Sequence, residues 1–329
     1  MYPFQFIEGQ TAEAAIHAVV NDPQAVFLAG GTTLVDLMKL DVMTPGALVD
    51  INRALPDAIE ERGGKIQIGA NVRNSDVAYH RLIRENFPVL SEAILAGASA
   101  QLRNMASTGG NILQRTRCPY FREAHAACNK RAPGSGCDAM KGYHRSHAVL
   151  GTSESCIATH PSDMCVALAM LDVIVSTQRA DGTSRRIPFN DFHLLPRDTP
   201  ERETVLERGE LIVRVEIEPS NVSRQSHYLK VRDRASYEFA LASSAVALDL
   251  EGDTIRAARV ALGGVATKPW RSPEAEAALT GKLAAKKTFG VAAEAAFAHA
   301  TPRRDNAFKI ELGKRTLVRA LEETWQQQS

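Results

Sequence analysis

The chain has 329 residues, 44% of them hydrophobic, and its 39 basic and 38 acidic side chains leave a formal net charge of +1. A chain of this size can bury a full hydrophobic core and is expected to form two or three domains. The near-neutral charge provides no general attraction to nucleic acid or to a membrane surface, and no run approaches the roughly 18 apolar residues of a membrane span.

The N-terminal quarter is predicted to be an α/β unit. Thr11 is a candidate N-cap for a helix with apolar residues at helical spacing, and the apolar run at 25–28 predicts a strand that ends in two glycines. Helical spacing resumes at 32–40, and the runs at 47–51 and 65–70 favour further strands.

The glycine turn after the first of these strands has the chemistry of a phosphate site. Gly30 and Gly31 let backbone N–H groups face an anion without an intervening Cβ, and Thr32 and Thr33 add hydroxyl donors. A tight turn without a ligand is about equally consistent with this one motif. The motif lacks the G-x-G-x-x-G spacing of the classical dinucleotide-binding fold.

A long helix is predicted over residues 87–107, and a second glycine turn follows it directly. Thr108, Gly110 and Asn111 repeat there the hydroxyl and glycine chemistry of the first turn. Two turns of matching chemistry are more easily explained by one extended, phosphate-bearing cofactor than by two unrelated tight turns.

All five cysteines lie between residues 118 and 165. Their odd number and their clustering disfavour a disulfide framework, so a metal or cluster site competes with packing as small hydrophobic residues. The spacing of the first four is looser than that of common zinc modules or bacterial ferredoxins, yet four thiolates from one loop can saturate a zinc ion or a cubane cluster. Nearby cations at Arg115, Arg117, Lys130 and Arg131 are expected to offset part of their negative charge.

The chain length on either side ties this loop to the second glycine turn and to the helix that follows. Cys118 comes seven residues after Asn111, and Cys156 comes seven residues before Asp163. Each cysteine is therefore within roughly 25 Å of a predicted cofactor contact. Cys165 falls in an apolar helical run and is predicted to be a buried core thiol.

The remaining elements suggest one more domain. A helix capped near Ser162 or Asp163 is expected to run into a strand by residue 178, and either side chain could instead bind a ribityl or ribose hydroxyl. Residues 182–210 are rich in Pro and charge, which predicts a domain boundary or long surface connection. Strand patterns from residue 211 onward, with Ala-rich helical segments, indicate a further α+β domain.

Four stretches carry a family resemblance: AGGTTL at 29–34, TGGN at 108–111, HPSD at 160–163 and KVRDRASYEFA at 230–240. Over nearly its whole length the chain resembles the FAD-binding medium subunits of molybdenum hydroxylases, the xanthine dehydrogenase and carbon monoxide dehydrogenase group. With its cysteine loop it is very similar to the FAD subunits of three-subunit bacterial periplasmic aldehyde oxidoreductases.

The resemblance implies an α+β chain with a vanillyl-alcohol-oxidase or PCMH-type FAD-binding fold and a C-terminal CO-dehydrogenase-flavoprotein-like α+β domain. The FAD-binding subdomains are expected at residues 1–55 and 56–215, with an Fe–S loop at 115–156, and the C-terminal domain at 216–329. The implied FAD contacts are Leu28, Ala29, Gly30, Gly31, Thr32, Thr33, Leu34, Arg103, Thr108, Gly110, Asn111, Ser162, Asp163, Lys230 and Tyr237. The implied ligands of a [4Fe-4S] cluster are Cys118, Cys128, Cys137 and Cys156.

The resemblance also implies a function. Substrate is oxidised at a molybdenum cofactor in a large subunit, electrons pass through two [2Fe-2S] clusters in a small subunit, and FAD in this chain hands them to an external acceptor. No catalytic triad or H-E-x-x-H motif is present, so no catalytic residue is expected here. The N-terminus lacks the pattern of an export signal, so periplasmic residence would require co-export with a signal-bearing partner, with the cytoplasm as the alternative.

Other functions stay open at this point. The chain could be the FAD subunit of a xanthine or N-heterocycle dehydrogenase, or a free-standing flavin oxidase, which would be active as a monomer. A zinc-stapled binding module would explain the cysteines without redox chemistry and would give a colourless, zinc-containing protein.

Overall fold

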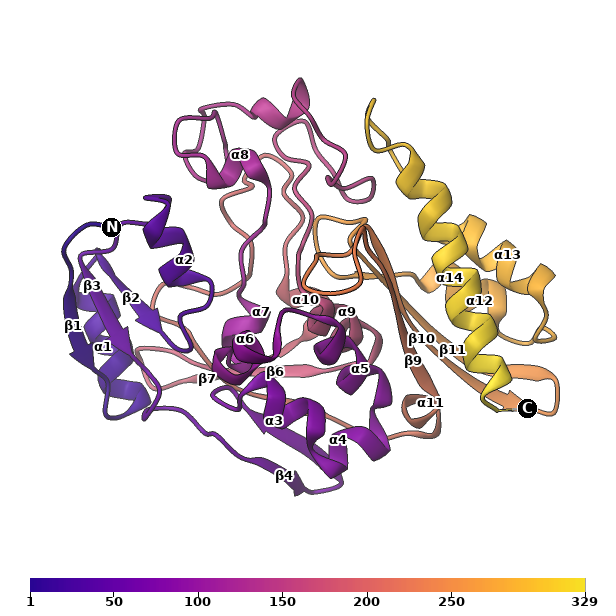
Figure 1. Cartoon of the computed structure of the whole chain (residues 1–329). Helices are drawn as coiled ribbons and strands as arrows, with labels where there is room; N and C mark the ends of the chain where they lie inside the picture. The colour runs from indigo at the N-terminus through magenta and orange to yellow at the C-terminus, as the bar shows by residue number, and fades with distance from the viewer. Residues whose placement is uncertain (329) are drawn as a thin grey trace.

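Three β-sheets follow one another along the chain, and the computed structural model describes residues 1–328 (Figure 1). The loop that carries the cysteines projects at the top of Figure 1, between the N-terminal unit and the C-terminal helix. Of the helices in residues 1–328, none is both long and apolar enough to cross a membrane.

The first sheet is parallel and forms the predicted N-terminal α/β unit. Its strand order is β1-β3-β2, with β1 (Gln5–Glu8), β2 (Ala25–Leu28) and β3 (Ala47–Asp50), and the helices α1 (Ala12–Asn21) and α2 (Leu34–Lys39) belong to the same unit. The Thr11 hydroxyl accepts a hydrogen bond from the N–H of Ala14 and caps α1. The predicted helix, strand, glycine turn and second helix are all confirmed.

The second sheet is antiparallel, with strand order β4-β5-β8-β6-β7. Its strands are β4 (Ile59–Arg62), β5 (Lys65–Gly69), β6 (Ile174–Gln178), β7 (Ser184–Pro188) and β8 (Leu211–Ile217). Its helical segments are α3 (Asn74–Tyr79), α4 (Arg81–Asn86), α5 (Pro88–Ala96), α6 (Ala100–Met105), α7 (Thr108–Ile112), α8 (Pro119–Arg122), η1 (Asp138–Met140), α9 (Asp163–Met170) and α10 (Phe189–Phe192).

Two expectations about this region were wrong. Residues 182–210 do not form only a surface connection, because β7 and α10 lie within them and bury Ile187, Phe189 and Phe192 in the main core. The strand at 211–217 does not open a new domain, because β8 pairs with β5 on one side and β6 on the other. Charge and proline content concealed β7, whose sequence SRRIP has two adjacent arginines and one buried apolar side chain, Ile187.

The helix predicted over residues 87–107 is in fact two helices. It breaks at Gly97-Ala98, where Ala98 has a φ of 52°, and restarts as α6 with the Ser99 hydroxyl accepting from the N–H of Leu102. The predicted turn at 108–111 is the first turn of α7, because the Ser107 hydroxyl caps it by accepting from the N–H of Gly110.

The third sheet is antiparallel, with strand order β12-β11-β10-β9, and has its own apolar cluster. Its strands are β9 (Ser226–Val231), β10 (Ala242–Glu251), β11 (Thr254–Gly263) and β12 (Trp270–Arg271). The accompanying helices are α11 (Asn221–Arg224), α12 (Pro273–Leu279), α13 (Lys286–Ala296) and α14 (Phe308–Gln326), and α14 packs along β9 and β10 (Figure 1).

One histidine joins a helix of the second sheet to the C-terminal helix. His227 on β9 lies 2.8 Å from Glu92 on α5 and 3.0 Å from Glu323 on α14. The hydrogen bond to Glu92 is the largest of the causes that raise the pKa of His227 above its usual 6.5.

This contact predicts a pH-dependent stability. Because the folded-state pKa of His227 is raised, its contribution is fully present below about pH 6.5 and is lost as pH rises through the folded-state value. His227→Gln should therefore lower the free energy of unfolding more at pH 6 than at pH 9, by at most about 1 kcal/mol for such half-exposed partners. Thermal unfolding at the two pH values measures the loss of stability, and His17→Gln, at an exposed histidine, is the control. Equal losses of stability at pH 6 and pH 9 in His227→Gln would contradict the prediction.

Candidate functional site

A cleft of about 560 Å³ lies between α2 with the turn before it, the helices of the second sheet, and β9 with the loop after it. A second hollow of about 220 Å³ adjoins it and shares Thr32, Thr33 and Gly110 in its wall. Of the predicted FAD contacts, the first cavity is lined by Thr32, Thr33, Arg103, Gly110, Asn111, Asp163, Lys230 and Tyr237, and the second adds Ala29, Gly30, Gly31 and Leu34. The combined space is within the range of natural cofactor sites.

The first glycine turn presents unused backbone donors to this space. Within residues 1–328, the N–H groups of Gly31, Thr32 and Thr33 donate no hydrogen bond. Gly30 packs so closely on the end of α6 that a Cβ there would overlap the carbonyl oxygen of Met105, and Gly31 has a φ of 72°. The turn therefore needs glycine, and its free N–H groups suit a diphosphate.

The second glycine segment contributes less than its sequence suggested. Its N–H groups are already used: Thr108 donates to Val72, and Gly110 donates to Ser107. The Thr108 hydroxyl also donates to the Val72 carbonyl, and its side chain lies outside both cavities. Leu28 and Ser162 lie outside these two cavities as well.

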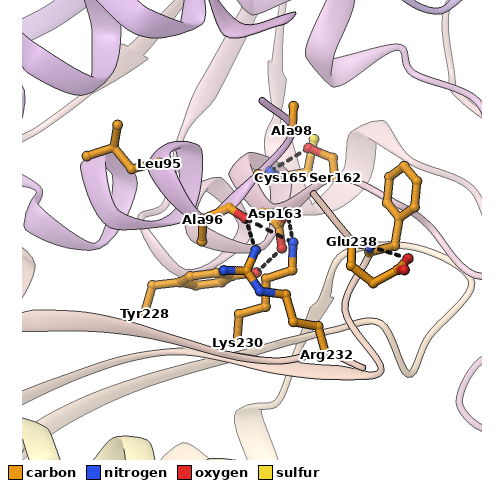
Figure 2. Close-up of polar contacts among 12 residues, drawn as sticks. Leu95, Ala96, Ala98, Ser162, Asp163, Cys165, Tyr228, Lys230, Arg232 and Glu238 are labelled. Carbon is orange, nitrogen blue, oxygen red and sulfur yellow. Dashed lines mark hydrogen bonds and ion pairs between the residues drawn. The ribbon is translucent and has the colours of Figure 1, made fainter. Parts of the chain in front are cut away.

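A buried ion pair closes the far side of the cleft. The Lys230 ammonium lies 2.8 Å from an Asp163 carboxylate oxygen, and these side chains are only 4% and 8% exposed. The Tyr228 hydroxyl donates to the other carboxylate oxygen at 2.6 Å, and the Ala96 carbonyl accepts from both Lys230 and Arg232 (Figure 2). Burial, followed by the neighbouring carboxylate, raises the pKa of Tyr228 well above its usual value of 10.0.

Other predicted residues shape the mouth and the wall of the cleft. Asn111 accepts a 2.6 Å hydrogen bond from the Ser162 hydroxyl, which fixes the start of α9 against α7. Arg103 donates to the Gly97 carbonyl at 2.7 Å. Tyr237 is 55% exposed and has a φ of 53°, a strained conformation that recurs at functional sites.

Unsatisfied polar atoms point to a ligand in this cleft. Asn74 Oδ1, Arg103 Nε and Arg117 Nε are buried, have no partner in the described chain, and belong to residues that line the cleft. Because buried polar atoms are nearly always hydrogen-bonded, a polar cofactor that filled the cleft would account for them.

Sequence reasoning missed the cluster that joins the cleft to the cysteine loop. Asp36 on α2 accepts from Arg117 at 2.8 Å and from Arg122 at 2.6 and 3.0 Å. The Arg122 hydrogen bond is the largest cause that lowers the pKa of Asp36. The available signal was an acidic residue three positions after the last threonine of the Gly-Gly-Thr-Thr motif, with one arginine directly before Cys118 and another four residues after it.

The structure brings four cysteines of the loop around one small cavity. Cys118, Cys128, Cys137 and Cys156 all line it; Cys137 is the most accessible, and Cys128 and Cys137 also pair through a short backbone bridge. Cys165 is fully buried in α9, outside this cavity. Of the expected cations, Lys130 lines this cavity and its charge opposes the raised pKa of Cys156, while Arg115 and Lys130 also pair with Glu203.

These thiols receive hydrogen bonds that favour the thiolate. Burial raises the pKa of Cys118 to about 12, against the opposing effect of backbone N–H groups of Phe121 and Tyr120. Burial also raises the pKa of Cys137 and of Cys156. The N–H groups of Ala139 and Met140 oppose this effect at Cys137, and the Lys130 charge followed by the Ala158 N–H opposes it at Cys156. Donors aimed at buried sulfurs are suited to thiolates that bind a metal or a cluster.

Another group of possible ligands lies nearby, and we assign it to packing. His160, Cys165 and His193 place their nitrogen and sulfur atoms within 4.8 Å of one another. His160 Nδ1 accepts from a backbone N–H, and the pKa of each histidine is lowered, mainly by burial and also by nearby charges that include lysines. Positive surroundings disfavour a bound cation.

The fold and this cleft define a flavoprotein. Residues 2–220 match the family described as the FAD binding domain in molybdopterin dehydrogenase, and residues 227–324 match the CO dehydrogenase flavoprotein C-terminal domain. The chain belongs to this family of oxidoreductase flavoproteins, which confirms the predicted FAD-binding fold and C-terminal domain.

Individual relatives agree over almost the whole chain. The chain is 51% identical to the aldehyde oxidoreductase FAD-binding subunit PaoB of Escherichia coli over 314 residues, which covers 95% of each sequence. It is 27% identical to the carbon monoxide dehydrogenase medium chain of Hydrogenophaga pseudoflava, over 92% of this chain and 89% of that one. The solved carbon monoxide dehydrogenase structure from that organism superposes with a TM-score of 0.77, covering 99% of both chains at 26% identity.

The glycine turn can be tested directly. Gly30→Ala should reduce the FAD content of the purified protein severely, because its Cβ would push the turn away from Met105. The control is Gly290→Ala, whose Cβ would meet nothing within 4 Å and which should keep full flavin. A Gly30→Ala protein with normal flavin content would contradict this assignment.

The buried ion pair gives a stability prediction. Lys230→Met should lower the free energy of unfolding by about 3–5 kcal/mol, because it leaves the Asp163 carboxylate buried without a counter-charge. Adding Asp163→Asn should recover part of the loss. The control is Lys65→Met, which removes a 3.7 Å ion pair with Glu218. Because the side chains of Lys65 and Glu218 are 41% and 73% exposed, this change should lower the free energy of unfolding by less than about 1 kcal/mol. Denaturant titration measures all three; equal losses from both lysines would contradict the prediction.

Proposed function

We propose that this chain is the electron-transfer flavoprotein subunit of a three-subunit, molybdenum-containing aldehyde oxidoreductase. The 51% identity to an aldehyde oxidoreductase FAD-binding subunit over 95% of both sequences carries this proposal. Its partners would be a large subunit with the molybdenum cofactor and a small subunit with two [2Fe-2S] clusters. Electrons would leave through this chain to an external acceptor.

The chain's own residues would position FAD rather than transform a substrate. The free N–H groups of Gly31, Thr32 and Thr33 would hold the diphosphate, and the Lys230–Asp163 pair would fix the opposite wall. Bound FAD supplies the ability to accept and release electrons singly or in pairs. Tyr237, exposed at the mouth, would stand between the cofactor and solvent.

We also propose that Cys118, Cys128, Cys137 and Cys156 bind a [4Fe-4S] cluster. Support comes from the single cavity they share and from the backbone N–H groups aimed at the sulfurs of Cys118, Cys137 and Cys156. In the described chain no three of these sulfurs lie within 4.8 Å of one another, whereas tetrahedral zinc with Zn–S bonds of about 2.3 Å needs sulfurs roughly 3.8 Å apart. Metal analysis of the purified complex distinguishes a cluster from a zinc ion at this cavity.

The location of the complex stays a prediction. If the complex is co-exported to the periplasm, the cysteine thiolates would be exposed to an oxidising compartment. They would be protected there only if the cluster is assembled before export. Fractionation of cells that express all three subunits would distinguish the periplasm from the cytoplasm.

The first experiment removes one proposed ligand. Cys128→Ser should eliminate iron and acid-labile sulfide beyond the content of two [2Fe-2S] clusters, while the flavin absorption bands persist. The matched control is Cys165→Ala, which removes a buried thiol outside the cavity and should retain the excess iron and sulfide.

The purified complex is analysed for iron, sulfide, zinc, molybdenum and flavin, before and after dithionite. Flavin and molybdenum without excess iron would refute the cluster but leave the electron-transfer subunit intact. A flavin-containing monomer that oxidises aldehydes without partners would refute the proposed subunit role.

A further inference from the structure

One side chain touches a sulfur of the cysteine cavity. His147 Nε2 lies 3.1 Å from Cys118 Sγ, and both residues are buried. The other hydrogen bonds to these sulfurs come from backbone N–H groups, at least two for Cys118 and one for Cys156. Among the hydrogen bonds of residues 1–328, that of His147 is the one between a side chain and the sulfur of a loop cysteine.

The contacts of the His147 ring indicate which of its nitrogens carries the proton. His147 Nδ1 is buried and has no hydrogen-bond partner in residues 1–328, so a proton there would be left unpaired. A proton on Nε2 instead points at the sulfur, and a thiolate accepts it. With its proton assigned to Nε2, the ring is a donor to a Cys118 thiolate.

The C-terminal domain holds this histidine in place. The His147 carbonyl accepts from Lys309 Nζ at 3.1 Å and from Asn306 Nδ2 at 3.4 Å, and neither of these side chains is exposed to solvent. His147 also donates its own N–H to the His144 carbonyl at 3.0 Å. The backbone of His147 is thus held by α14 and the segment before it, outside the cysteine loop.

We propose that His147 is a positioning residue that donates an Nε2–H hydrogen bond to the Cys118 thiolate and raises the reduction potential of the cluster. This inference rests on the proposed [4Fe-4S] cluster. A hydrogen bond to a cluster sulfur stabilises the more negative, reduced state, and such bonds are among the determinants of cluster potential. The C-terminal domain thereby influences the redox balance between the cluster and the flavin.

The test is a potentiometric titration of the purified three-subunit complex, followed by electron paramagnetic resonance. At the wild-type midpoint of the [4Fe-4S] cluster, His147→Phe should lower the ratio of reduced to oxidised cluster about five-fold, as expected for loss of one hydrogen bond of about 1 kcal/mol. His147→Gln, which can present an N–H at similar reach, should restore most of the ratio. The control His144→Gln should leave it unchanged.

Each other outcome also decides the question. A full cluster with an unchanged midpoint in His147→Phe would overturn the inference, and so would a shift shared equally by His144→Gln. If the His147→Phe variant loses its cluster, the wild-type complex is labelled with ¹⁵N-histidine and its reduced cluster is examined by electron paramagnetic resonance. A magnetic coupling between the cluster and one histidine nitrogen would support the hydrogen bond from His147, and the absence of such a coupling would refute it. A wild-type complex without excess iron would instead refute the proposed cluster, and this inference with it.

Discussion

The arrangement of the cleft depends on the buried contact between Asp163 and Lys230. These residues lie 67 positions apart, on the first turn of α9 and on β9, yet their charged groups meet at 2.8 Å with almost no solvent access. A buried carboxylate and ammonium tolerate little separation, because each needs the other to compensate for lost hydration. The pair therefore fixes the third sheet against the helices of the second, and the cleft forms where they meet.

A second set of contacts determines where the cysteine loop lies. Asp36, beside the glycine-threonine turn, binds the arginine before Cys118 and a second arginine four residues after it. Lys309 holds the other end of the loop by donating to the carbonyls of Ser146, His147 and Gly264. The loop is thus attached both to α2, beside the turn at residues 30–33, and to the C-terminal domain, which gives the proposed cluster a fixed position relative to both.

Local sequence patterns predicted the elements that are stabilised locally. The helix capped by Thr11, the strand ending in Gly30-Gly31 and the helix capped by Ser162 each occur where their periodicity and caps placed them. The predictions that were wrong concern segments whose structure depends on tertiary contacts rather than on local sequence. Ala98 in a left-handed conformation splits one predicted helix, and β8 joins the middle sheet because strands distant in sequence offer it two partners.

The sequence alone determined the chemistry available to this protein: glycines and threonines for a diphosphate, four clustered thiols, and the family to which these motifs belong. Only the tertiary structure decided which of these groups face the cleft. In the folded chain the N–H groups of the second glycine segment donate hydrogen bonds, while those of Gly31, Thr32 and Thr33 in the first remain free. The loop cations pair with Asp36 and Glu203, and His147 lies against Cys118. A sequence pattern specifies which groups can form hydrogen bonds, but burial and distance determine which partner each one finds.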